Sequence, residues 1–213
     1  VLFALFFRPV GFDYRSKVAD PRWRNAWDYA LCFSGVLPSI LFGVAVGNLF
    51  VGLPFKFDSA MHVSYGGGFF DLLQPFALFC GVVSLTMIVT HGASFLHLRS
   101  VGAVAQRARL ITIGGGIATA ALFAVGGALV NHLPGLSILS QGDINSALTP
   151  FMKQVVATPG GWLHFLADYP VLWLVPLTGI SASLLASLSA WRNWQWLAFI
   201  SRPRQMCAGA TYF

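Results

Sequence analysis

The stretch LITIGGGIATAALFAVGGALV, residues 110–130, decides the fold. None of its residues is charged, and about 20 apolar residues in a helix are enough to cross the hydrocarbon core of a bilayer. Over the whole chain only 9% of residues are charged and 56% are hydrophobic, whereas soluble domains carry roughly 25% charged residues. The sequence therefore predicts an all-α, polytopic transmembrane helix bundle with a surface that faces lipid.

Three other helices with long apolar centres are predicted, at about residues 21–50, 69–98 and 169–191. The first of them has a clear start, because Asp20 can cap a helix and Pro21 suits the first helical position. Each stretch is long enough to span a bilayer. We therefore expect four complete transmembrane helices.

The two ends of the chain fit this pattern less simply. As a helix, residues 1–7 would rise only about 10 Å, so this run is interpreted as the tail of a preceding helix. Near the other end, Arg202 and Arg204 interrupt a further apolar stretch. We treat residues 1–200 as one partial transmembrane domain and residues 201–213 as a tail without an assigned fold.

The basic residues are distributed unevenly among the loops. Eleven of the thirteen Lys and Arg residues fall in alternate loops, and positive residues gather in the cytoplasmic loops of membrane proteins. The eleven are Arg8, Arg15, Lys17, Arg22, Arg24, Arg99, Arg107, Arg109, Arg192, Arg202 and Arg204, and the other two are Lys56 and Lys153. We expect loops 8–26 and 99–109 in the cytoplasm and loops 51–68 and 131–168 in the periplasm. Short basic clusters between apolar runs also argue against a nucleic-acid partner.

Small residues recur at every fourth position in three of the predicted helices. Lipid supplies no hydrophobic force between helices, and small residues at this spacing let two backbones approach closely. The rows are Gly35, Ser39, Gly43 and Gly47; Gly116, Ala120, Ala124 and Ala128; and Gly179, Ser183 and Ser187. We expect each row to face protein rather than lipid.

Side chains that could hold a haem are few and poorly matched. A membrane haem held by two protein ligands needs His or Met side chains at equal depth around one pocket. His91 lies within a span and Met87 lies one turn before it, so both are on one helix face. The remaining histidines, His62, His97, His132 and His164, do not mirror His91 on another span. We therefore assign no catalytic, cofactor-binding or metal-binding residue, and we disfavour a bis-histidine cytochrome b.

Carboxylates are absent from the predicted bilayer centre. The chain has no Glu, and its Asp residues fall in loops or near the membrane interfaces. An ion-coupled transporter usually keeps a carboxylate at membrane depth and often shows internal repeats, and neither feature is visible here. A multi-pass permease or secondary transporter is therefore the alternative function rather than the leading one.

The first basic loop makes the sequence recognisable. Residues 5–17, LFFRPVGFDYRSK, resemble the signature loop of subunit II of cytochrome bd-type ubiquinol oxidases. The likeness continues in WRNAWD at 23–28, GVAVGNLFVGLPF at 43–55 and FFDLLQPF at 69–76. It covers about residues 2–200, and the first loop is its most specific part.

This resemblance implies a respiratory complex of the bacterial inner membrane. Such a complex oxidises ubiquinol, reduces dioxygen to water with cytoplasmic protons and so generates a proton motive force. The resemblance implies that haem b and haem d are ligated by subunit I, and that subunit II supports that partner and in some members holds a bound ubiquinone. The expected partners are subunit I, quinol, dioxygen and membrane lipid. Compared with the family, this chain is expected to be a fragment that lacks both ends.

Four charged residues of the signature loop are candidate structural or subunit contacts: Arg8, Asp13, Arg15 and Lys17. Two pairings are open within this segment, Asp13 with Arg8 and Asp13 with Arg15. Such pairs contribute little when they are exposed to solvent and more when the loop docks onto a partner. A fully solvated loop is the plainer interpretation of the same residues.

Overall fold

The structure is a computed structural model that describes residues 1–60, 62–140, 154–163, 169–194, 196–197 and 199–200. The chain divides into two compact units, Val1–Ile88 and Val89–Phe213. The boundary falls within one helix, and each unit is described by itself.

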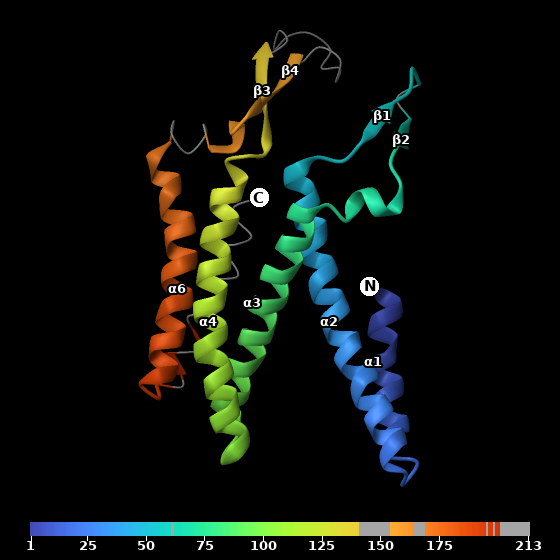
Figure 1. Cartoon of the computed structure of the whole chain (residues 1–213), viewed down its shortest axis with the longest axis vertical. Helices are drawn as coiled ribbons and strands as arrows, with labels where there is room; N and C mark the ends of the chain where they lie inside the picture. Colours follow the sequence, from blue (N-terminus) through green and yellow to red (C-terminus); the bar gives the residue numbers. More distant parts are fainter. Residues whose placement is uncertain (61, 141–153, 164–168, 195, 198, 201–213) are drawn as a thin grey trace. The chain divides into compact units, whose positions relative to one another are not determined.

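The first unit is built on a pair of adjacent helices. Helix α1, Leu2–Tyr14, packs beside α2, Pro21–Val51, after a short turn (Figure 1). Beyond α2 come the antiparallel strands β1, Phe55–Phe57, and β2, Val63–Tyr65, with Phe55 opposite Tyr65. The short 3-10 helix η1, Phe69–Leu72, then leads into α3, Pro75–Arg99, whose first part belongs to this unit.

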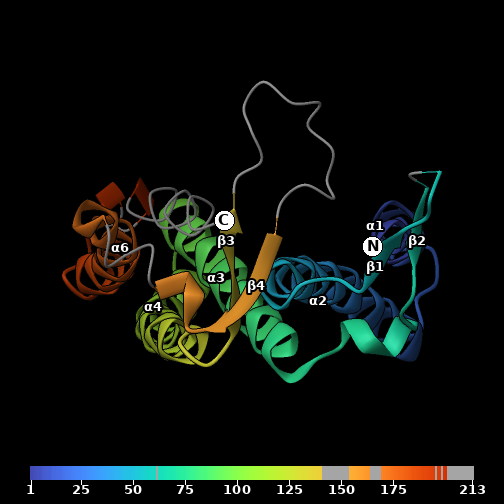
Figure 2. The same ribbon diagram turned by 90° about the horizontal axis from the view of Figure 1, so that it is seen from above.

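The second unit holds the end of α3 and two further long helices. These are α4, Ala103–Val130, and α6, Leu174–Trp191, which pack side by side, with the 3-10 helix η3, Pro170–Trp173, before α6. Strands β3, Pro134–Ser140, and β4, Gln154–Pro159, pair antiparallel and lie alongside each other when seen from above (Figure 2). They stand at one end of this unit, and the α3–α4 turn lies at the other (Figure 1).

Four helices of the described chain are long and apolar enough to span a membrane. They cover Pro21–Val51, Pro75–Arg99, Ala103–Val130 and Pro170–Trp191. The predicted all-α bundle with four spans is therefore confirmed. The start at Asp20 is confirmed as well, because its carboxylate accepts a hydrogen bond from the backbone N–H of Arg22, with Pro21 at the first helical position.

The two loops predicted at residues 8–26 and 99–109 are mostly helical: 8–14 belong to α1, 21–26 to α2 and 103–109 to α4. Helix α1 continues to Tyr14 and contains Arg8, Pro9 and Asp13, so the turn itself is short. Pro9 and Gly11 favour a loop in the sequence, but Gly11 is buried against α2. A Cβ on Gly11 would lie 2.7 Å from the Leu31 side chain, so this glycine permits a close helix contact.

The two β-hairpins were not predicted. They lie within the loops expected at residues 51–68 and 131–168, so they do not disturb the helical bundle. Strands β1 and β2 hold only three residues each, all exposed, which gives too short an alternation to identify from sequence. The second hairpin carries an irregularity between Ile138 and Ser140.

Candidate functional site

The signature segment lies at the turn between α1 and α2, where an ion pair joins the two helices. Arg15 Nε donates to Asp28 Oδ1 at 2.5 Å, and Arg15 Nη2 donates to Asp28 Oδ2 at 3.0 Å. This bidentate geometry is typical of a strong guanidinium–carboxylate pair. The hydrogen bond to Asp28 and the charge of that carboxylate raise the pKa of Arg15, so the guanidinium stays charged. Arg15 thereby ties the end of α1 to α2.

Arg15 thus pairs with Asp28 and not with Asp13, one of the two pairings that the sequence left open. On a helix, residues two positions apart do not face each other, whereas Asp28 comes from the facing helix. Asp13 is exposed on α1. Arg8 lies earlier in α1 and faces α2, where a Cβ on Gly35 would be 3.1 Å from Arg8 Nη2. Gly35 thus leaves room for the Arg8 guanidinium.

Aromatic side chains reinforce the same turn. The rings of Tyr14 and Trp27 stack with centroids 6.1 Å apart, and Trp23 meets Trp27 edge-on at 5.9 Å. The indole N–H of Trp23 donates to the backbone carbonyl of Tyr14 at 2.8 Å. Lys17 Nζ lies 4.3 Å from the centroid of the Tyr14 ring. The turn is thus a fixed arrangement of three aromatic rings with two basic groups around it.

The first small-residue row lies where α2 meets the start of α3. Ser39, Gly43 and Gly47 are buried. A Cβ on Gly43 would lie 2.7 Å from Gly81 Cα, and one on Gly47 would lie 2.7 Å from Ala77 Cα. At these positions the two backbones are close enough that only glycine fits.

The second and third small-residue rows meet between α4 and α6. Ser183 Oγ donates to the carbonyl of Gly116 at 2.7 Å, both partners being buried. Ala120, Gly179 and Ser187 are buried too, while Ala124 and Ala128 are exposed in this chain. Gly116 and Ala120, the first half of the α4 row, therefore lie at the α6 contact. That protein also covers Ala124 and Ala128 in the complex stays a prediction.

Arg109 is an inter-helix contact that the sequence analysis did not single out. Its Nε donates to the carbonyl of Ala190 at 2.9 Å, and its Nη2 donates to the carbonyl of Trp191. The contact joins α4 to the last turn of α6. Only its position in the sequence could have indicated this contact. Arg109 directly precedes the uncharged stretch 110–130, so it lies at the same membrane depth as the end of an antiparallel neighbouring helix.

The histidines of α3 pack within the second unit. The ring of His91 stacks on Phe199 with centroids 5.6 Å apart, and the buried ring of His97 lies with Nδ1 3.3 Å from the carbonyl of Ala105. Being six residues apart on one helix, they cannot face each other across a ligand. The described residues contain no cluster of three His, Cys, Asp or Glu side chains suited to a metal ion. His164 lies outside the described residues.

This arrangement defines a multi-pass α-helical membrane protein held together by small-residue contacts and a fixed, basic α1–α2 turn. Residues 1–212 match the family described as cytochrome bd terminal oxidase subunit II. The chain belongs to that family.

Curated relatives agree with this family. The chain is 42% identical over 191 residues to the cytochrome bd-I ubiquinol oxidase subunit 2 of Escherichia coli strain K12, covering 89% of this chain and 50% of the relative. It is 42% identical over 185 residues to a probable cytochrome oxidase subunit 2 of Haemophilus influenzae, covering 87% of this chain and 49% of the relative. A cytochrome bd ubiquinol oxidase subunit 2 of Bacillus subtilis is 32% identical over 109 residues, which are 51% of this chain and 31% of that protein. The chain thus spans about half the length of the first two relatives.

The family implies haem in the complex, and the two candidate ligands within a span, His91 and Met87, do not fit a haem held by both of them. The candidate ligands His91 and Met87 lie one turn apart on the same helix. Two ligands on one helix face cannot bind opposite sides of one iron. No chemical step is therefore assigned to a haem ligated within this chain.

Proposed function

We propose that this chain is the helical scaffold part of subunit II of a quinol oxidase that oxidises ubiquinol and reduces dioxygen to water. The observation that carries the proposal is the 42% identity to a ubiquinol oxidase subunit 2 over 89% of this chain. The family match leaves the permease interpretation without support. In this proposal haem b and haem d are ligated by subunit I, in the bacterial inner membrane.

The role proposed for this chain is to present a rigid helical surface to subunit I. Close backbone packing at Gly43 and Gly47 leaves little freedom between α2 and the start of α3. Exposed Asp13 and Lys17 lie beside the Arg15–Asp28 pair at the α1–α2 turn, and exposed Arg8 lies within α1. A backbone turn held by the Arg15–Asp28 pair suits docking onto a protein partner better than a mobile loop would, because the cost of ordering the turn is already met within the chain.

A reduced-minus-oxidised spectrum of the affinity-purified protein tests this function. Purified with its co-expressed neighbouring oxidase subunit, the chain should carry haem bands and support quinol-dependent oxygen uptake. Purified without that partner, it should carry no haem band. A stable haem spectrum from the chain alone would refute the scaffold proposal, and failure to capture any haem-bearing partner would refute the oxidase assignment.

Substitution of the two candidate ligands makes a sharper prediction about haem. Within the assembled complex, His91→Ala and Met87→Ala should each leave every haem band in place, because neither side chain is proposed to touch iron. His97→Ala serves as a control for general damage to α3, since His97 is buried on the same helix. Loss of one haem band from a complex that assembles at wild-type yield would contradict the prediction.

The orientation in the membrane follows from the charge count and is also a prediction. With the native cysteines replaced, a single cysteine at Ser59 should react with a membrane-impermeant maleimide in intact cells, because Ser59 lies in the predicted periplasmic loop. A cysteine at Ser100 should react only after the cells are opened. The reverse pattern would show that the basic loops face outward. Ser146, a second predicted periplasmic position, lies outside the described residues.

A further inference from the structure

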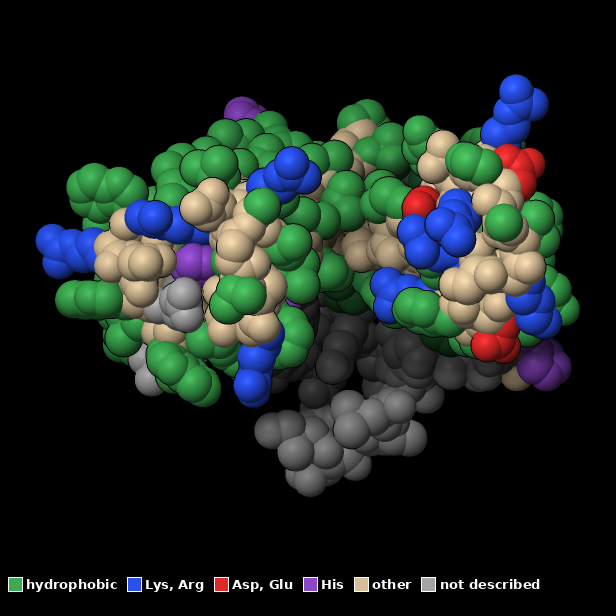
Figure 3. Space-filling model, turned by 90° about the horizontal axis from the view of Figure 1, so that it is seen from below, with side chains coloured by type: hydrophobic (Ala, Val, Ile, Leu, Met, Phe, Trp, Pro, Cys, Tyr) green, Lys and Arg blue, Asp and Glu red, His purple; other side chains and the backbone are tan. Residues whose placement is uncertain are grey.

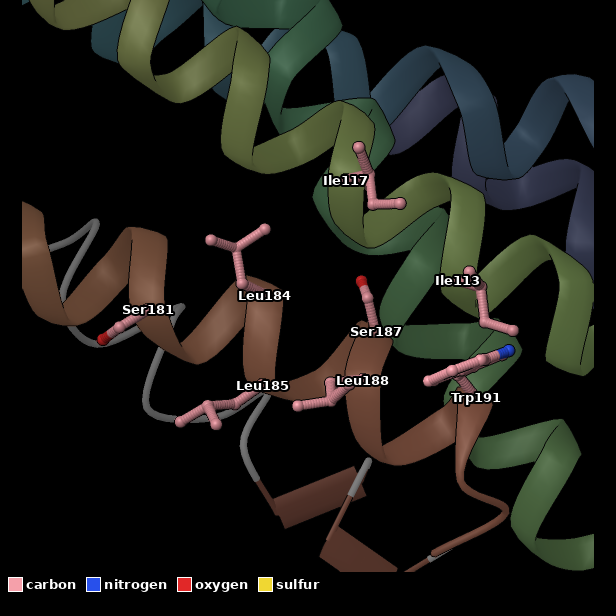
Figure 4. A pocket seen from close by; sticks show the side chains of 8 residues that line it. All are labelled: Ile113, Ile117, Ser181, Leu184, Leu185, Ser187, Leu188 and Trp191. Carbon is pink, nitrogen blue, oxygen red and sulfur yellow. The ribbon is translucent and has the colours of Figure 1, made fainter.

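An apolar groove of about 580 Å³ runs along the joint between α4 and α6 (Figure 4). Ile113 and Ile117 line it from α4, and Leu185, Leu188 and Trp191 line it from α6. The leucines are about half exposed and Trp191 is 63% exposed. The groove therefore opens onto the outer surface of the second unit, where a membrane protein meets the acyl chains of lipids.

Both walls of this groove end in an arginine. Arg109 lies four residues before Ile113 on α4, and Arg192 caps the end of α6 four residues after Leu188, so each arginine follows its wall at about one helical turn. Arg109 also contacts the last turn of α6, which brings the ends of the two walls together. A guanidinium has five N–H donors, and the two bonds to α6 leave others available.

No acidic side chain balances these arginines within the described part of residues 89–200. The end of this unit carries Arg99, Arg107, Arg109 and Arg192, and Lys and Arg side chains are spread over the surface when the molecule is seen from below (Figure 3). The Arg192 guanidinium lies 5.7 Å from the Trp194 ring, a neutral partner that leaves its charge in place. The end of the unit next to the groove is therefore positively charged, one helical turn beyond the lining residues Ile113 and Leu188.

The chain that follows α6 does not cover the groove lining where it is described. Phe199 returns to α3, where its ring lies 5.6 Å from that of His91 and 6.0 Å from that of Phe95. Those contacts involve α3, whereas the groove is lined by α4 and α6 alone. The occupant must then combine an apolar body with a negative group at one end.

We propose that the groove binds an anionic phospholipid of the surrounding bilayer. One acyl chain lies along Ile117, Ile113 and Leu188, and the phosphate is held between Arg109 and Arg192. Trp191 lies between the acyl chain and the phosphate, which is the position at the membrane interface that indole rings favour. An apolar helix of another protein would fill the groove equally well but would leave the arginines without a counter-charge, which favours the lipid. The proposal stands apart from oxidase activity.

Lipid-dependent quenching of tryptophan fluorescence in the detergent-solubilised full chain tests this site. Phosphatidylglycerol with brominated acyl chains should quench part of the fluorescence at lower lipid fractions than brominated phosphatidylcholine does. Trp191→Phe should remove that selective component, because bromine quenches only by contact. Equal quenching by the two lipids, or a selective component that survives Trp191→Phe, would overturn the proposal.

Two exposed arginines provide a matched pair for the headgroup. Arg192→Gln should weaken the selective binding of phosphatidylglycerol about fivefold, the effect expected for one charge near an anionic phosphate. Arg107→Gln removes the same charge from α4, two residues away from Arg109 and so on another helix face, and should change binding by less than twofold. Equal losses in both variants would indicate general charge attraction and refute a defined site. If a Leu185→Cys variant forms a disulfide with a second copy of the chain or with another protein, the groove holds a protein, and the lipid proposal is refuted.

Discussion

Replacing Gly43 by leucine is expected to prevent the normal packing of α2 against the start of α3. Even the first added carbon would lie 2.6 Å from Ser84 Cβ and 2.7 Å from Gly81 Cα, and it would also clash with the carbonyl of Cys80. Backbone atoms cannot move aside as the end of a side chain can, so the helices must separate. Overpacking a well-packed core typically costs about 1–3 kcal/mol, and we expect about 3 kcal/mol or more here because the clash includes backbone atoms.

The measurement is the unfolding midpoint of the detergent-solubilised chain, with its yield from membranes. Gly43→Ala should already destabilise, because the clash begins at Cβ. Gly114→Leu is the matched control: it adds the same side chain within a helix at a glycine with nothing within 4 Å of its Cβ position. A Gly43→Leu variant as stable as the Gly114→Leu variant would show that α2 and α3 are not closely packed at this point.

The four spans were predictable because membrane helices are constrained by single-residue properties. A backbone in hydrocarbon must satisfy its own hydrogen bonds, so length and apolar composition suffice to identify a helix. The stretch 110–130 and the start at Asp20 and Pro21 needed no tertiary information. The small-residue spacing that indicated Gly43 and Gly47 is likewise a property of one helix.

The features that could not be predicted depend on a partner distant in sequence. Helix α1 continues through Pro9 because Gly11 packs against Leu31 of α2, a contact that local propensity does not encode. Arg15 selects Asp28 over the nearer Asp13 because α2 brings Asp28 opposite it. Sequence distance is a poor guide to ion pairs once two helices fold back on each other.

The α4–α6 joint shows the same division within a single contact. The row from Gly116 indicated a helix partner but not which one, and Ser183 identifies it by donating a buried hydrogen bond to the Gly116 carbonyl. The row on α4 and the row on α6 thus form the two sides of one interface near Gly116 and Ser183. The exposed Ala124 and Ala128 show that spacing alone does not mark where such an interface stops.

The second large effect is expected from Arg109→Gln, which removes the link between α4 and the end of α6. The last turn of a helix lacks intrahelical donors for its carbonyls, and Arg109 donates to two of them, those of Ala190 and Trp191. The Ala190 carbonyl also accepts from the backbone N–H of Asn193 at 3.2 Å, so the Trp191 carbonyl depends more on Arg109. The positive guanidinium also lies at the negative end of the α6 dipole. Hydrogen bonds from a charged donor contribute about 1.5–3 kcal/mol, so the variant should lose about 2 kcal/mol of stability.

Denaturant titration in mixed micelles measures this loss, with Arg107→Gln as the control. Both substitutions remove one positive charge from the same helix, but Arg107 is exposed, so its variant should stay within about 0.5 kcal/mol of the parent. Arg109→Lys should fall between the two, because an ammonium keeps the charge without the guanidinium's paired donors. Since the last turn of α6 would lose its partner first, Trp191 should also become more accessible to aqueous quenchers in Arg109→Gln. Equal stability of the Arg109→Gln and Arg107→Gln variants would mean that charge, rather than the bonds to the α6 carbonyls, is what Arg109 contributes.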